Sequence, residues 1–138
     1  MERAEQEERI RRLSAEYLVL RNLVQELQRR VDALNRVLME ISDTISSLES
    51  VKELDEEHFI LFPIGFMSYV KGKVVNKNKV LINVGAGVVI EKTVEEAMEY
   101  LKDKQKTIQL ELRTTVAQLQ QASARLSELE TILEKEAK

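Results

Sequence analysis

Apolar residues recur along the first third of the chain at spacings that alternate between three and four, with polar residues between them. This is the a/d pattern of a left-handed coiled coil, in which each helix buries only a narrow stripe. No Gly or Pro interrupts it, so it predicts one long helix from about Glu5 to Lys52. The seam consists of Ile10, Leu13, Tyr17, Leu20, Val24, Leu27, Val31, Leu34, Leu38, Ile41, Ile45 and Leu48.

A second seam with the same spacing closes the chain. Thr93 is followed three residues later by Glu96, a capping-box signature, so a second helix is predicted to begin there and run to about Lys135. Two seams of equal length predict an antiparallel helical hairpin, with Leu48 near Val94 and Ile10 near Leu133. The second seam consists of Val94, Met98, Leu101, Gln105, Ile108, Leu112, Thr115, Leu119, Ala122, Leu126, Leu129 and Leu133.

Between the seams the pattern changes to short apolar runs punctuated by Gly and by Pro63, the only proline. Short runs between turn residues are typical of β-hairpins. We expect strands at residues 59–62, ending at Pro63, and at 66–75, 80–84 and 88–91. The fold class is then α+β, with two central hairpins inserted into a long antiparallel coiled coil. The expected division is residues 1–56 for the first helix, 57–92 for the hairpins and 93–138 for the second helix.

Two stretches within the hairpins resemble a known family. Leu61-Phe62-Pro63-Ile64-Gly65, followed by Ser68-Tyr69-Val70-Lys71-Gly72, is similar to the first hairpin of the α-class subunit of prefoldin, in its archaeal type. The run from Val84 to Lys92 is similar to the last turn and strand of that family. Phe66-Met67 departs from it, because members often have another small residue after Gly65. The β-class has one hairpin, so two hairpins favour the α-class.

The resemblance implies an ATP-independent chaperone without a cofactor. Prefoldin subunits assemble as a hexamer of two α-class and four β-class subunits, whose hairpins join into a β-barrel platform. The coiled coils hold non-native client proteins at their tips and pass them to a group II chaperonin.

The residues support an oligomer independently of the resemblance. Apolar hairpins with unpaired edges must meet other strands or aggregate. The alternative is a small sheet that folds back on its own coiled coil. The residues expected to oligomerise are Phe62, Val74, Val80, Ile82, Val84, Val88 and Ile90.

A coiled coil frays at its free end, which would expose seam residues there to clients. Exposed apolar surface with charged rims suits weak and promiscuous binding of unfolded chains. Further apolar residues lie off the seam, at Val19, Leu23, Val116 and Ile132. Alternatively, they complete the seam or lie singly on the surface. The expected client-binding residues are Ile10, Leu13, Tyr17, Leu126, Leu129, Ile132 and Leu133.

Composition narrows the classes of function. Net charge is −3, from 21 basic and 24 acidic residues, which disfavours nucleic acid and an anionic membrane as partners. The chain lacks Cys and has one His, so no metal or nucleophile set is indicated. Gly85-Ala86-Gly87 is interpreted as a turn and Asp55-Glu56-Glu57-His58 as a solvated helix exit. We expect a cytoplasmic protein that is not an enzyme; the alternative function is a scaffolding coiled coil that binds a specific partner helix.

Overall fold

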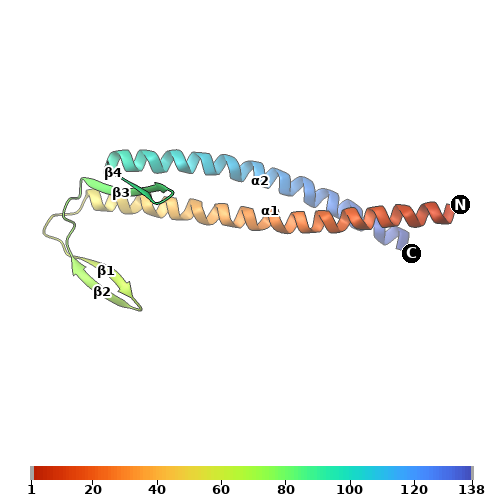
Figure 1. The fold of residues 1–138 in the computed structure, drawn as a ribbon, viewed down its shortest axis with the longest axis horizontal. Helices are drawn as coiled ribbons and strands as arrows, with labels where there is room; N and C mark the ends of the chain where they lie inside the picture. The colour runs from red at the N-terminus through yellow and green to blue at the C-terminus, as the bar shows by residue number, and fades with distance from the viewer. Residues whose placement is uncertain (1, 138) are drawn as a thin grey trace. The chain divides into compact units, whose positions relative to one another are not determined.

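Along the chain, a long helix, two β-hairpins and a second long helix follow one another in the computed structural model, which describes residues 2–137 (Figure 1). The hairpins are separate two-stranded antiparallel sheets, β1 with β2 and β3 with β4. The expected α+β class of two helices around two hairpins is therefore confirmed. The elements in chain order are α1 (Glu2–Lys52), β1 (Ile60–Gly65), β2 (Ser68–Gly72), β3 (Lys79–Gly85), β4 (Val88–Thr93) and α2 (Val94–Ala137).

The capping box at the start of α2 is confirmed. The backbone N–H of Glu96 donates to Oγ1 of Thr93 at 3.1 Å, and the Thr93 N–H donates to Oε1 of Glu96 at 3.3 Å. At the end of α1, the Leu54 N–H donates to the Val51 carbonyl at 3.1 Å, and Nζ of Lys77 donates to the Leu54 carbonyl at 3.0 Å. Both junctions thus satisfy backbone groups that a helix terminus leaves unpaired.

Hairpin β1–β2 differs from the expected one in its strand limits. β1 continues through Pro63, which pairs with Tyr69, and the register shifts between Pro63 and Gly65. The expectation that the strand ends at Pro63 is wrong, because a strand with only one neighbour tolerates a residue without an N–H. The turn lies at Phe66 and Met67, where Met67 has φ 47°. The expected strand 66–75 is correspondingly reduced to Ser68–Gly72.

Hairpin β3–β4 has Ile82 opposite Ile90, so the two side chains share one face of the ribbon. The turn places Ala86 at φ 51° and Gly87 at φ 75°. Two successive left-handed residues match the twist of a tight hairpin, and Gly adopts this conformation without a steric penalty.

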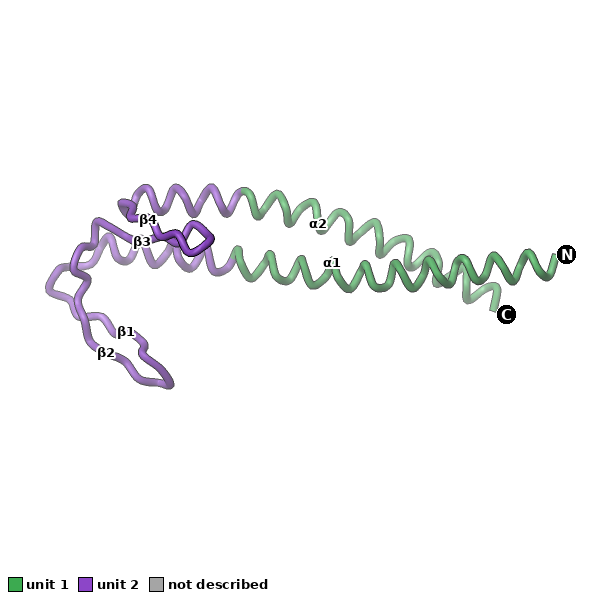
Figure 2. The backbone as a smooth tube through the Cα atoms, viewed as in Figure 1, with its two compact units in different colours: residues 1–38, 107–138 green, residues 39–106 purple. Residues whose placement is uncertain are grey.

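The chain forms two compact units (Figure 2). The terminal unit contains residues up to 38 and residues from 107 onward, and the central unit contains residues 39–106. Leu48, Val94 and Ala97 are the buried core of the central unit, which confirms the predicted proximity of Leu48 and Val94. The buried residues of the terminal unit are Leu27, Val31, Thr115, Ala122 and Leu129.

Candidate interaction surfaces

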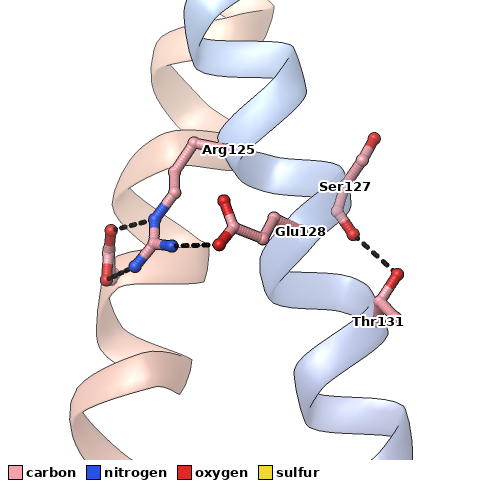
Figure 3. A network of polar contacts seen from close by, with 5 residues as sticks. Arg125, Ser127, Glu128 and Thr131 are labelled. Carbon is pink, nitrogen blue, oxygen red and sulfur yellow. Dashed lines mark hydrogen bonds and ion pairs between the residues drawn. The ribbon is translucent and has the colours of Figure 1, made fainter.

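Ion pairs join the two helices of the terminal unit along their flanks. Arg125 holds Glu16 with two hydrogen bonds, Nε to Oε1 at 2.9 Å and Nη2 to Oε2 at 3.2 Å. Its Nη1 also lies 3.2 Å from Oε1 of Glu128 on its own helix (Figure 3). Nη2 of Arg30 donates to Oε1 of Glu111 at 2.7 Å. Since planar guanidinium groups bind carboxylates in a fixed geometry, these contacts hold the two helices in one register.

The pairing of Arg125 is reflected in the acidity of both groups. The hydrogen bond from Arg125 lowers the pKa of Glu16, and the reciprocal bond raises the pKa of Arg125. Both side chains remain partly exposed to water, which screens the attraction. The pair therefore contributes more to alignment than to stability.

The expected client-binding residues are more shielded than fraying would leave them. Leu129 is completely buried, so its expected exposure is wrong. Tyr17 is half-buried and its hydroxyl donates to Oε1 of Glu130 at 3.2 Å, while Nη1 of Arg9 lies 2.6 Å from Oε1 of Glu136. These cross-helix contacts hold the helices together where separation was expected. The remaining expected residues, Ile10, Leu13, Leu126, Ile132 and Leu133, are half-buried.

The exposed apolar residues of the terminal unit lie instead beside the seam. Leu18, Val19, Leu23 and Val37 are exposed on α1, and Leu110 is exposed on α2. Val19 and Leu23 had been identified as off-seam residues in the sequence, whereas Val116 and Ile132 are half-buried. Leu18 was missed, although its position outside the a/d pattern was a sufficient signal.

Hairpin β1–β2 exposes large apolar side chains on both faces. Phe62 and Val70 lie opposite each other on one face, and Tyr69 lies on the other; all three are exposed. Phe66 at the turn is 92% exposed. A ribbon of two strands has marginal stability in water and leaves backbone N–H and C=O groups unpaired at both edges. This hairpin could therefore accept further strands at its edges.

The residues expected to oligomerise around β3–β4 differ in how far the chain's own helices cover them. Val80 and Ile82 pack against the core of Leu48, Val94 and Ala97, so the β3 side of the face expected to be unpartnered is covered at these two residues by the chain's own helices. The alternative interpretation, a sheet folded back on its coiled coil, describes these two residues. Val88 and Ile90 are exposed and Val84 is half-buried, while Val74, also half-buried, lies between the hairpins and in no strand.

The acidic helix exit forms local turns. Oδ1 of Asp55 accepts the N–H of Glu57 at 3.2 Å, and its Oδ2 lies 4.0 Å from Nδ1 of His58. Within residues 2–137, no group of three or more His, Cys, Asp or Glu side chains is arranged to hold a metal ion. No helix in that range is long and apolar enough to span a membrane.

Comparison with known proteins identifies the family of the chain. The family model described as "Prefoldin subunit" matches residues 20–138. The chain belongs to the prefoldin family. It is similar to the prefoldin subunit alpha of Pyrococcus horikoshii, with 31% identity over 127 residues that cover 91% of this chain and 86% of the relative. It is also 32% identical to the prefoldin subunit alpha of Methanosarcina acetivorans, covering 97% of this chain and 94% of the relative.

A solved structure has the same fold. A chain of the filamentous PFD from Methanocaldococcus jannaschii, determined by cryo-EM, aligns with a TM-score of 0.71 and 22% identity. The alignment covers 88% of this chain and 98% of the neighbour. Together with the α-class relatives, the fold makes this chain a chaperone subunit of the prefoldin type.

Proposed function

We propose that this prefoldin subunit is an ATP-independent holdase that captures non-native proteins along the paired helices of its terminal unit. The observation that carries the proposal is the exposure of Leu18, Val19 and Leu23 on a helix whose other exposed residues are mostly polar or charged. Exposed apolar surface of this kind suits transient binding of unfolded segments. Several such subunits in one assembly would raise the effective affinity by orders of magnitude over a single contact.

The assembly proposed is a hetero-hexamer of two copies of this chain and four β-class subunits in the cytoplasm, joined through the hairpins. The exposed faces of β1–β2 support this proposal, because covering large apolar side chains such as Phe62 and Phe66 with a partner lowers the free energy of the system. Delivery of the captured client to a group II chaperonin completes the proposed function.

A truncation tests where the client is held. Removal of about ten residues from each terminus deletes the outer seam residues Ile10, Leu129 and Leu133 and leaves the hairpins intact. We expect the truncated chain to assemble with a β-class partner, by native mass, and to keep most of its suppression of client aggregation, because Leu18, Val19 and Leu23 remain. Complete loss of protection by a correctly assembled truncated chain would place capture at the ends of the helices instead.

The scaffolding function remains a second candidate because of one observation. Leu129 is fully buried and Arg9, Tyr17, Glu130 and Glu136 hold the helix ends together, which leaves less free apolar surface there than a client site at the extreme end requires. A scaffold would bind one partner helix with a fixed stoichiometry. A holdase would instead protect several unrelated unfolded proteins in the same aggregation assay.

A further inference from the structure

A groove opens on the flank of the terminal unit, between two of the ion pairs that join its helices, Glu16–Arg125 and Arg30–Glu111. It has a volume of about 460 Å³. Small clefts of this size are large enough to receive one or two apolar side chains. Its lining consists of Leu20, Leu23, Leu27, Gln118, Gln121, Ala122 and Arg125.

The register of the ion pairs explains why the groove is open. Glu16 pairs with Arg125, and Arg30 pairs with Glu111; these partners are spaced by fourteen residues on each helix, two heptads. The position midway between them carries Leu23 on α1 and Gln118 on α2, which cannot form an ion pair. The row of ion pairs along this flank therefore lacks a pair at its middle position, where the side chains of Leu23 and Gln118 line the groove.

A small seam residue deepens the opening. Ala122 occupies a heptad position that is mostly Leu, Ile or Val elsewhere in the two seams; it lines the groove and is buried, as is Leu27. A larger side chain at this position would fill part of the groove, and Leu23 at its rim is exposed.

The chemistry of the rim indicates what the groove can bind. The guanidinium of Arg125 is already neutralised by Glu16 and Glu128, so it offers no free charge to a phosphate or a carboxylate. Within residues 2–137, the side-chain amides of Gln118 and Gln121 make no hydrogen bond to another residue, and each amide can both donate and accept. An extended polypeptide has free backbone N–H and C=O groups for these amides, whereas a folded helix has already paired its own.

The geometry points to this groove as a client subsite that binds an extended segment of a non-native polypeptide by inserting one large apolar side chain over Leu20, Leu23 and Ala122. The inference rests on the proposed holdase function and moves its contact away from the closed helix ends. The subsite works with the two helices paired. Its specificity is for an uncharged stretch with an exposed backbone and a Leu, Ile, Met or Phe side chain.

The test captures the contact covalently and maps it. The probe is reduced, carboxymethylated lactalbumin, a permanently unfolded chain, carrying photo-leucine in place of leucine and mixed with the full-length protein in its native assembly. After irradiation, mass spectrometry locates the cross-links. We expect them to concentrate in residues 18–27 and 118–125.

The deciding variant adds the missing ion pair. L23E/Q118R places an acid on α1 and a base on α2, in the same orientation as Glu16 and Arg125, so it should retain the fold while covering the groove. We expect at least about a tenfold lower cross-link yield, because the client can no longer bury a Leu side chain in the covered groove. L23S is the second variant, in case the double variant misfolds by circular dichroism. L110E is the matched control, since Leu110 is exposed but does not line the groove, and its yield should stay within about twofold.

Each contrary result is distinct. Unchanged yield in a folded L23E/Q118R assembly, or cross-links confined to residues 2–17 and 126–137, would overturn the subsite and leave the holdase proposal standing. An altered native mass of the variant would also overturn it, by showing that the groove contacts another subunit. Absence of cross-links to either helix in the parent protein would overturn both proposals.

Discussion

The two hairpins of the central unit have the same local structure and opposite relations to the rest of the chain. On β3–β4, Val80 and Ile82 pack on the core formed by Leu48 and Val94. On β1–β2, Phe62 and Val70 share a face that remains exposed. One hairpin therefore packs on the chain's own helices, while the apolar faces of the other are left exposed by the rest of the chain. Local strand pattern specifies a hairpin, but the neighbouring helices decide whether it is also an interface.

The largest expected effect is on assembly through β1–β2. F62S/V70S removes the cross-strand apolar pair from one face, so we expect association with a β-class partner to weaken by at least about tenfold, as measured by sedimentation velocity. Stability of the isolated subunit should change little, because neither side chain is buried there. L110S, which removes an exposed Leu outside the hairpins, is the control. A hexamer of unchanged mass and affinity would place the interface elsewhere.

The complementary change on β3–β4 should act on folding. I82A removes a side chain packed against Leu48, Val94 and Ala97, and we expect it to reduce the free energy of unfolding by about 1–3 kcal/mol in urea denaturation. L81A is the matched control, because Leu81 immediately precedes Ile82 on β3 and its side chain is exposed. Equal losses for the two variants would show that the helices do not stabilise this hairpin as described.

A smaller effect is expected where Phe62 crosses Gly72. A Cβ added at Gly72 would lie 2.6 Å from Cε2 of Phe62, so G72A must displace the ring. Displacement from a favoured rotamer should weaken assembly by about two- to tenfold. G65A is the control, because a Cβ there meets nothing within 4 Å. If both variants assemble like the parent, the position of the Phe62 ring does not matter at the interface.

The smallest expected effect is a pH dependence at the junction of β4 and α2. Hydrogen bonds from Thr93, through its side chain and then its backbone, lower the pKa of Glu96. A lowered pKa stabilises the fold fully above the unfolded value, about 4.3, and this contribution is lost as pH falls through the folded value. The thermal midpoint should therefore fall on acidification, and less steeply in E96Q, whose side chain does not titrate. Identical pH profiles would show that the capping box contributes no pH dependence.

The comparison also shows how far sequence reasoning extends into the candidate sites. The a/d spacing, the Thr93–Glu96 box and the turn at Ala86-Gly87 depend on residues a few positions apart, so they were predictable. The exposure of Leu129 was misjudged, because frayed and closed helix ends have the same heptad pattern. Leu18 could have been found from its position outside the seam. The opening between Leu23 and Gln118 could not, since it depends on which residues meet across two helices.

The amino-acid sequence by itself determined two long helices, two hairpins between them and membership of the prefoldin family. These properties follow from periodicity, capping and turn residues, which act over short distances along the chain. Tertiary structure alone decided that Val80 and Ile82 are covered while Phe62 and Val70 are not. It also decided that Ala122 lines a groove with Leu23 and Gln118, which form no ion pair. The physical reason is that burial depends on which elements pack together, and apolar residues with the same local pattern can be core in one hairpin and surface in the other.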